Sequence, residues 1–340
     1  MRVRPLPHMG PNADVIVSAM LALAVVSCGP STQAVGPSHN PATSPLASPT
    51  AVLRPRSTVL QATLAPWQLP APLSRMVVLT NEGRLLIIGG LNSGGTSVRS
   101  ILAADPTKGV VTSDGTLALA VHDSSGALLS GAAYIFGGGN SASISTVQVI
   151  KPGQSVQTTG NLPTARADLA ATVAGSEAVI VGGYDGTSPA NAVLATTDGA
   201  HFRVVGMLRS PVRYAAVAVM GSYLYVFGGE WAGQLSTAIQ RVDLGTGVVD
   251  VVGHLPVGLG HAAALVLNDQ IWLVGGLEPG GPSDGVLHFD PQSGGVASAG
   301  TLPKPVSDAG IAVLGGTGYL VGGEVAGSPI STVVELKAMN

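Results

Sequence analysis

The chain has 340 residues, of which 46% are hydrophobic and only 10% are charged, and it contains 47 glycines and 24 prolines. So many turn-forming residues indicate an all-β protein and argue against a helical one. The formal net charge of −3 offers no basic surface, so we expect no nucleic-acid partner.

The first 27 residues have the features of a secretory signal peptide, in the expected order. Arg2 and Arg4 precede an apolar run, residues 15–26, which is shorter than the roughly 20 residues that a membrane-spanning helix needs. The segment that closes the run, residues 25–28 (Val-Val-Ser-Cys), resembles the lipobox of bacterial lipoproteins. The resemblance implies cleavage after Ser27 and a lipid on Cys28. It also implies an extracytoplasmic protein anchored to the cell membrane, or to the outer membrane if one is present.

Residues 28–56 contain the only cysteine of the chain, Cys28, at their first position. The later part of the chain therefore has no intramolecular disulfide, thiolate metal cluster or catalytic cysteine. The segment is rich in Pro, Ser, Thr and Ala and has almost no large apolar residues, so it cannot bury a core. We expect residues 28–56 to be a disordered tether between the lipid and a folded domain, residues 57–340.

Six repeats of one pattern fill residues 57–340. Each contains a pair of apolar residues followed by two glycines, and successive first glycines are 48, 45, 46, 47 and 47 residues apart. The pairs are Gly89-Gly90, Gly137-Gly138, Gly182-Gly183, Gly228-Gly229, Gly275-Gly276 and Gly322-Gly323. A period near that of a four-stranded sheet predicts the blades of a β-propeller.

Other features recur within each repeat. A run of small apolar residues, such as 215–219 or 262–266, precedes the glycines and suits an innermost strand crowded around a central channel. A second strand ends at the glycines, and a third and a fourth strand follow. The pattern resembles the kelch family, whose blades carry a double glycine after the second strand, and this resemblance implies a six-bladed kelch-type β-propeller.

The two ends of the repeat region complement each other. The chain ends just after a third-strand segment, residues 331–336, and no fourth strand follows it. Residues 58–64 have the position and composition of a fourth strand. We therefore expect this N-terminal strand to complete the C-terminal blade and close the ring.

Polar and aromatic residues recur at two places in each repeat, directly after the glycines and just before the first strand. Both places open on the same face of a propeller, so we expect one ligand-binding rim around the channel mouth. The candidate residues are Arg75, Asn92, Asp123, Asn140, Arg166, Asp168, Tyr184, Asp185, Arg213, Tyr214, Glu230, Trp231, His261, Glu278, Asp308 and Glu324. Arginines, carboxylates and aromatics together are typical of a glycan or peptide site. Alternatively, such residues stabilise turns or pair between blades.

The function that these features favour is a non-enzymatic, membrane-tethered module that binds a protein or a glycan, and we expect a monomer. The alternative is a sugar mutarotase or epimerase, because the bacterial N-acetylneuraminate mutarotase is also a six-bladed kelch propeller. That resemblance implies an acid and a base, with Glu230, Glu278 or Glu324 beside an arginine, Arg166 or Arg213, that holds a sugar carboxylate. The catalytic residues stay unassigned. The scattered histidines favour no zinc site, and we expect neither a metal nor a cofactor.

Overall fold

The computed structural model describes residues 59–339, in which every regular element is a β-strand. The predicted signal peptide, Cys28 and the tether lie outside the described residues. Within residues 59–339 there is no helix of the length and hydropathy that a membrane span requires.

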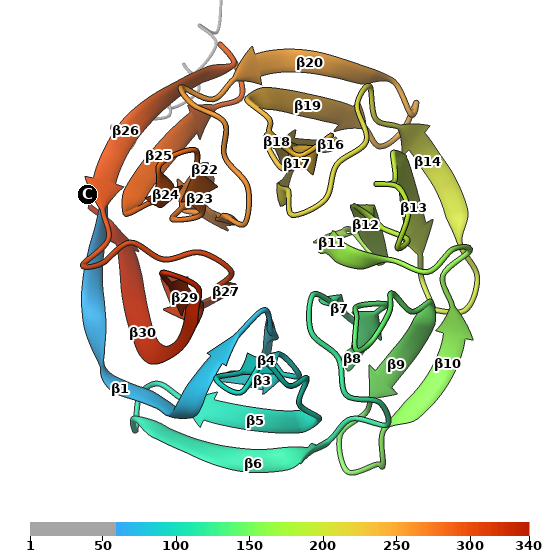
Figure 1. Cartoon of the computed structure of the whole chain (residues 1–340), viewed down its shortest axis with the longest axis vertical. Coiled ribbons are helices and arrows are strands. Elements are labelled where there is room, and N and C mark those ends of the chain that lie inside the picture. Colours follow the sequence, from blue (N-terminus) through green and yellow to red (C-terminus); the bar gives the residue numbers. More distant parts are fainter. Residues whose placement is uncertain (1–58, 340) are drawn as a thin grey trace, which may run out of the picture. The chain divides into compact units, whose positions relative to one another are not determined.

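Six sheets stand as blades around a ring, which confirms the predicted six-bladed β-propeller (Figure 1). Blade 1 comprises β2 (Val77–Asn81), β3 (Arg84–Ile88), β5 (Ser100–Asp105) and β6 (Val110–Thr116). Blade 2 comprises β7 (Ser125–Leu129), β8 (Ala132–Phe136), β9 (Thr146–Ile150) and β10 (Gln157–Asn161). Blade 3 comprises β11 (Ala167–Ala174), β12 (Glu177–Tyr184), β13 (Ala192–Thr196) and β14 (Arg203–Met207).

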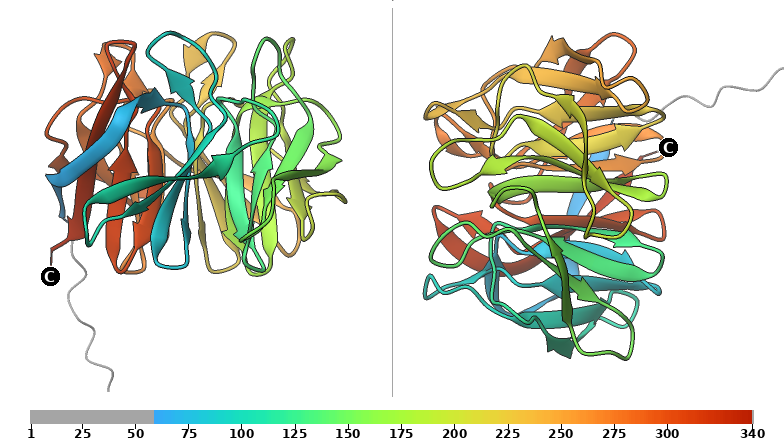
Figure 2. Two further views of the ribbon diagram at one scale, coloured as in Figure 1. Left: turned by 90° about the horizontal axis from the view of Figure 1, so that it is seen from below. Right: turned by 90° about the vertical axis from the view of Figure 1, so that its right-hand side faces the viewer.

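Blade 4 comprises β15 (Ala216–Met220), β16 (Tyr223–Phe227), β19 (Ala238–Asp243) and β20 (Val249–His254). Blade 5 comprises β21 (Ala263–Leu267), β22 (Gln270–Val274), β25 (Gly285–Asp290) and β26 (Gly295–Thr301). Within each blade, every strand is antiparallel to its neighbours. The loops between strands lie at the two faces of the ring (Figure 2).

Blade 6 is built from both ends of the described chain. It comprises β27 (Gly310–Leu314), β28 (Thr317–Val321), β30 (Ser328–Ala338) and, as its outer strand, β1 (Leu60–Ser74). Leu60 pairs with Ala338, and Leu64 pairs with Val334, in an antiparallel register. This pairing confirms the predicted closure, and it leaves the ring without an open blade.

Short hairpins follow the paired glycines in several blades. In blade 4 the hairpin joins β17 (Glu230–Trp231) to β18 (Gln234–Leu235), and in blade 5 it joins β23 (Leu277–Glu278) to β24 (Gly281–Pro282). In blade 6, β29 (Glu324–Val325) pairs with β30, and in blade 1, β4 (Leu91–Asn92) pairs with β1. These hairpins carry several of the candidate residues.

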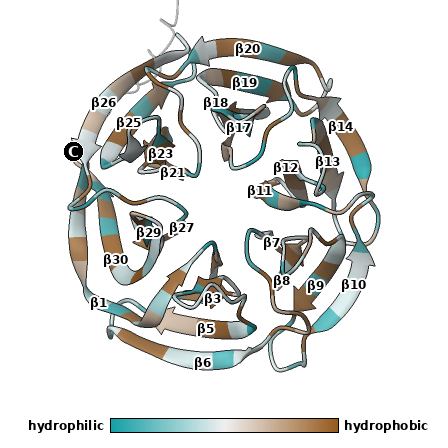
Figure 3. Ribbon diagram, viewed as in Figure 1, coloured by the Kyte–Doolittle hydropathy of each residue, from teal (hydrophilic) through white to brown (hydrophobic). Residues whose placement is uncertain are grey.

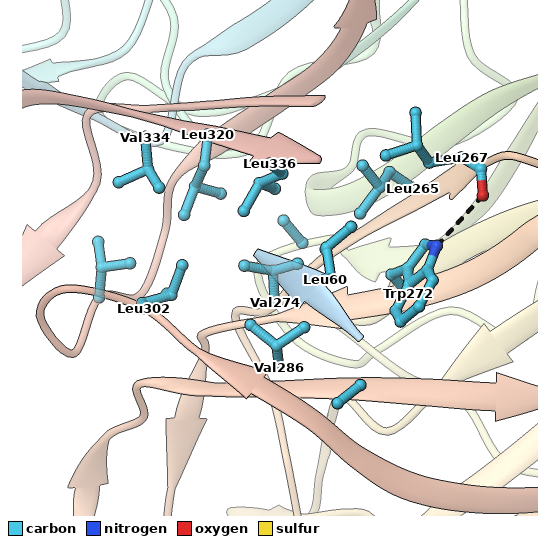
Figure 4. Close-up of a cluster of buried hydrophobic side chains, with 13 residues drawn as sticks. Leu60, Leu265, Leu267, Trp272, Val274, Val286, Leu302, Leu320, Val334 and Leu336 are labelled. Carbon is cyan, nitrogen blue, oxygen red and sulfur yellow. Dashed lines mark hydrogen bonds between the residues drawn. The ribbon is translucent and has the colours of Figure 1, made fainter. Parts of the chain in front are cut away.

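The core lies between blades, because each sheet buries both faces against its neighbours. In outer strands such as β1 and β20, hydrophobic residues alternate with more polar ones (Figure 3), whereas an inner strand such as β22 is buried along its whole length. Figure 4 shows one such cluster, in which Leu60 of β1 meets Val274 and Val286 of blade 5 and Leu320 and Leu336 of blade 6. The closing strand is therefore held by apolar burial as well as by its hydrogen bonds.

The second glycine of each pair connects its blade to the next one. The Gly229 N–H donates to the Leu259 carbonyl at 2.8 Å, and the Gly276 N–H donates to the Val306 carbonyl at 2.8 Å. Equivalent bonds of 2.8–3.0 Å join Gly90 to Val121, Gly138 to Arg166, Gly183 to Val212 and Gly323 to Leu73. We call this contact the glycine latch.

The innermost strands surround a central channel. It has a volume of about 590 Å³ and is lined mainly by small aliphatic residues of β2, β7, β11, β15, β21 and β27. Small side chains allow six strands to converge there, as the sequence predicted.

Candidate functional site

One residue from each blade closes the channel at the face that carries the hairpins. These six residues, which we call the collar, are Arg75, Asp123, Asp168, Tyr214, His261 and Asp308. Each lies two positions after the carbonyl that receives a glycine latch. All six were among the residues predicted for the rim.

The backbone of the collar forms a closed ring of six hydrogen bonds. The N–H of each collar residue donates to the carbonyl of the collar residue in the preceding blade. The bonds run from Arg75 to Asp308, Asp308 to His261, His261 to Tyr214, Tyr214 to Asp168, Asp168 to Asp123 and Asp123 to Arg75, over 2.9–3.1 Å. The ring holds all six side chains around one axis.

Every collar residue has a positive φ, between 50° and 58°, although none is glycine. This left-handed conformation costs an ordinary residue about 1 kcal/mol and is tolerated mainly where the surroundings enforce it. Glycine would adopt it without that cost. Each collar side chain is therefore present in spite of the backbone conformation.

Arg75 joins the two ends of the described chain. Its Nε donates to Glu324 Oε1 at 2.8 Å, and its Nη1 donates to Asp123 Oδ2 at 3.2 Å. Glu324 is almost fully buried and also accepts a hydrogen bond from the Ser74 hydroxyl at 2.9 Å. The Arg75 charge is thus neutralised by carboxylates within the protein.

His261 occupies the centre of a second network. Its Nδ1 lies 2.6 Å from Asp308 Oδ1, its Nε2 lies 3.2 Å from Glu230 Oε1, and its ring stacks on Tyr214 at 3.8 Å. Burial alone would lower the pKa of His261, but its bonds to Asp308 and Glu230 raise that pKa overall. For Asp308 the effects have the opposite sign. Burial alone would raise the pKa of Asp308, but protonated His261 holds that pKa below the usual range.

Asp123 is the collar carboxyl best suited to exchange a proton. Burial raises its pKa from 3.8 to about 7, with Arg75 opposing the shift and the charges of Asp168 and Asp308 adding to it. Burial also raises the pKa of Asp168. The Tyr214 hydroxyl, whose own pKa is raised by burial, donates to Asp123 Oδ2 at 3.5 Å. Asp123 therefore titrates near neutral pH beside a hydroxyl that keeps its proton.

The collar and the residues that follow it enclose only about 110 Å³. A monosaccharide does not fit in this space, so a ligand of that size lies on the collar rather than within it. Among residues 59–339, no group of three or more His, Cys, Asp or Glu is placed to hold a metal ion.

A groove of about 270 Å³ lies beside the collar, between blades 3 and 4. Tyr184, Thr187, Pro189, Arg213, Glu230 and Trp231 line it, together with the turn at residues 232–233. We call it the rim groove. The Trp231 side chain is a large apolar surface open to solvent, since the residue is 51% exposed.

Arg213 connects the rim groove to the collar. Its Nη2 lies 2.9 Å from Glu230 Oε2, its Nη1 lies 3.4 Å from Asp168 Oδ2, and its guanidinium lies 5.1 Å from the ring centres of both Tyr184 and Tyr214. The backbone N–H of Arg213 donates to the Glu230 carbonyl, and the N–H of Glu230 donates to the Arg213 carbonyl. These bonds join the segment after the paired glycines to the segment before the first strand, which were predicted to open on the same face.

The other predicted residues support local structure. Arg166 is only 3% exposed, and its Nη1 donates to the carbonyls of Gly182 and Ala192, so its guanidinium does not reach the rim surface. Asn92 and Asp185 accept hydrogen bonds from N–H groups of their own turns. Glu278 accepts the Ser283 hydroxyl at 2.7 Å, and Asn140 is an exposed turn residue.

Two supporting residues were missed in the sequence. Ser74 bonds to Glu324, and the Ser307 hydroxyl donates to Asp308 Oδ2 at 2.8 Å. Both serines directly precede a collar residue. No repeated signal marks them, because the residues at this position in the other four repeats are His122, Ala167, Arg213 and Gly260.

Blade count and closure define the protein as a six-bladed β-propeller. No protein-family model matches the chain, and no curated protein is similar to it in sequence. In fold, the solved structure of YjhT matches 79% of this chain and 96% of its own, with a TM-score of 0.69 and 17% sequence identity. A likeness at this identity establishes the fold alone, and the kelch resemblance stays a prediction.

Proposed function

We propose that this protein is a glycan-binding propeller whose ligand lies on the collar and in the rim groove. The single observation that carries the proposal is Trp231, half exposed next to the Arg213–Glu230 pair in a 270 Å³ groove. An exposed indole offers a flat apolar surface to a sugar ring, and the adjacent polar groups exchange hydrogen bonds with hydroxyls. On a chain that we expect to be anchored through Cys28, such a site would lie outside the cytoplasm.

The charges around the site favour a neutral sugar over an acidic one. Arg75 and Arg213 are both paired with carboxylates, and Arg166 is buried. A sugar carboxylate would have to displace one of these internal partners and would also meet the charges of Glu230 and Asp308. Neutral hydroxyls avoid both costs.

The test is a glycan-array screen of the full-length chain, followed by titration of each glycan that binds. Trp231→Ala should weaken binding at least tenfold while leaving the melting temperature unchanged. The matched control is Leu119→Ala, which removes a comparably exposed apolar side chain, 43% exposed, from another blade. If no glycan binds, or if Trp231→Ala binds as well as the parent, the proposal is wrong and the search moves to protein partners.

A second candidate is a sugar mutarotase, and the pKa of Asp123, about 7, favours it. Opening and closing a sugar ring needs an acid and a base that exchange protons near neutral pH. In this structure Asp123 has that property. NMR measurement of anomer exchange decides the question: faster exchange that Asp123→Asn abolishes supports an enzyme, whereas binding without faster exchange supports a lectin-like module.

A further inference from the structure

A second candidate site lies away from the collar, where one contact of the repeat is missing. In blades 1 to 5 the fourth strand has a bulge that contains a glycine. In blades 2, 3 and 4, the turn between the third and fourth strands of the following blade packs on this glycine. A Cβ on Gly206 would lie 2.8 Å from the Gly247 carbonyl oxygen, and one on Gly160 would lie 2.7 Å from that of Gly199. Gly253 meets Gly294 in the same way, and Gly300 meets Leu60 of the closing strand.

The exception is the bulge glycine of blade 1. A Cβ on Gly115 would meet only its own blade, at 3.8 Å from Ile101 Cδ1, because the turn of blade 2 does not pack there. A cavity of about 620 Å³ opens instead between β6 and residues 150–156 of blade 2. We call it the blade 1–2 cavity. Its volume lies in the range of small-molecule sites.

The turn residue of blade 2 departs from the repeat in its charge. Where the third strand ends, blades 1, 4 and 5 have Asp105, Asp243 and Asp290, whose carboxylates accept N–H groups of the following turn. The register of β8 and β9 places Lys151 at this position in blade 2. A cation thus stands where three other blades have an anion. Blade 6 also has a lysine there, Lys337, which binds Glu335 at 2.8 Å.

Two more charged residues of blade 1, Asp114 and Arg84, line the same cavity. The extra residue of the fourth-strand bulge is Asp114 in blade 1, whereas it is Thr159, Val205, Val252 or Ala299 in the others. Arg84 begins β3 and lies 3.9 Å from Asp114, which is too long for a hydrogen bond. Its guanidinium N–H groups therefore keep the capacity to bind a ligand.

The cavity floor is apolar. Leu86 and Ile101, which are 4% and 1% exposed, belong to the core between blades 1 and 2, and Ile150 and Val156 pack against that core. The site thus combines an apolar floor with two cations, Arg84 and Lys151, and two carboxylates, Asp114 and Glu82. An elongated apolar body with a carboxylate at one end matches this combination.

We infer that the blade 1–2 cavity binds small carboxylates that carry an apolar chain, with Arg84 and Lys151 at the carboxylate and Leu86 and Ile101 under the chain. Such a group occurs in medium-chain fatty acids and at the C-terminus of apolar peptides. The inference does not depend on the proposed function, because the cavity shares no residue with the rim groove.

The experiment titrates the full-length chain with octanoate and with N-acetyl-leucyl-leucine, by saturation-transfer NMR and calorimetry. Each probe is compared with its neutral amide, octanamide or N-acetyl-leucyl-leucinamide. Binding of one carboxylate probe identifies the source of the ligand, and its amide should bind at least tenfold more weakly. Trp231→Ala should not change this binding, which separates the result from that of the glycan test.

Three variants locate the site. Lys151→Ala should weaken carboxylate binding about tenfold, and Lys151→Asp, which introduces the residue found in blades 1, 4 and 5, should abolish it without loss of thermal stability. Lys304→Ala removes an exposed lysine elsewhere and should bind like the parent. The inference is overturned if neither carboxylate binds, if the amides bind equally well, or if Lys151→Ala has no effect.

Discussion

Two positions recur in all six blades with a left-handed backbone, yet they differ in what occupies them. The first glycine of each pair has φ between 55° and 63°, and each collar residue has φ between 50° and 58°. The former is glycine six times, whereas the latter is arginine, aspartate, tyrosine or histidine and never glycine. The same backbone conformation is thus satisfied in two different ways.

The difference comes from what lies where a Cβ would stand. At the first glycine of each pair, a Cβ would clash with a carbonyl oxygen of the next blade, so no side chain fits. At the collar, the side chains meet one another across the channel mouth. Glycine is therefore required by packing at one position, whereas at the collar the side chains make contacts that offset the backbone cost.

The largest effect is expected for a Cβ added at the first glycine of a pair, because it would meet the carbonyl oxygen that accepts the glycine latch. Gly228→Ala places that atom against the Leu259 carbonyl oxygen and should lower the free energy of unfolding by about 3 kcal/mol or more. Gly221→Ala is the matched control, because φ there is +60° against +58° at Gly228 and nothing lies within 4 Å of the new atom. It should cost only about 1 kcal/mol. Equal losses in urea denaturation would show that conformation, not packing, selects glycine.

The next effect concerns the charge that holds Arg75. Glu324→Gln removes a buried carboxylate that accepts hydrogen bonds from Arg75 and Ser74, and it should destabilise the protein by about 2 kcal/mol. Glu278→Gln, at the corresponding hairpin of blade 5, should change stability by less than about 0.5 kcal/mol. A Glu324→Gln variant as stable as the parent would mean that the network around Arg75 contributes little.

A pH-dependent effect is expected at Asp123. Because its pKa is about 7 when folded and 3.8 ordinarily, the folded state binds this proton more tightly. The carboxyl favours folding most at low pH, and its contribution falls as the pH rises through 7. Asn does not titrate, so the Asp123→Asn variant does not lose this contribution as the pH rises. The melting temperature of the variant minus that of the parent should therefore increase by several degrees from pH 5 to pH 8. Parallel melting curves across this range would contradict the raised pKa.

The smallest effect is expected where glycine replaces a collar residue. Asp168→Gly relieves about 1 kcal/mol of backbone strain and removes a buried carboxyl, while Arg213 keeps its partner Glu230. The melting temperature should therefore change little. The variant should also lower the pKa of Asp123, since it removes a neighbouring negative charge. A loss of stability comparable to that of Gly228→Ala would show that the collar is mainly structural.

Much of the fold could be predicted because its signals are local and repeated. The paired glycines gave the number of blades, and the unmatched strands at the two ends gave the closure. The expected first strands, residues 215–219 and 262–266, each began one residue before β15 and β21. A strand start depends on hydrogen bonds to a partner strand, and local sequence does not specify these closely.

The candidate site was predicted less well. Arg75 and Arg166 both precede a first strand, yet Arg75 lies in the collar and Arg166 is buried. Aligned on the glycine latch, Arg166 shares its position with Leu73, Val121, Val212, Leu259 and Val306. That comparison would have assigned Arg166 to the interior, because an apolar residue occupies this place in the other five blades.

The sequence by itself determined the blade number and the closing strand, because glycine sterics and strand periodicity act over a few residues. Only the tertiary structure decided which charges meet. Arg75 and Glu324 are 249 positions apart and become neighbours only when the ring closes, and the collar requires all six blades at once. Burial within that ring raises the pKa of Asp123, whereas Trp231, outside the collar, stays half exposed.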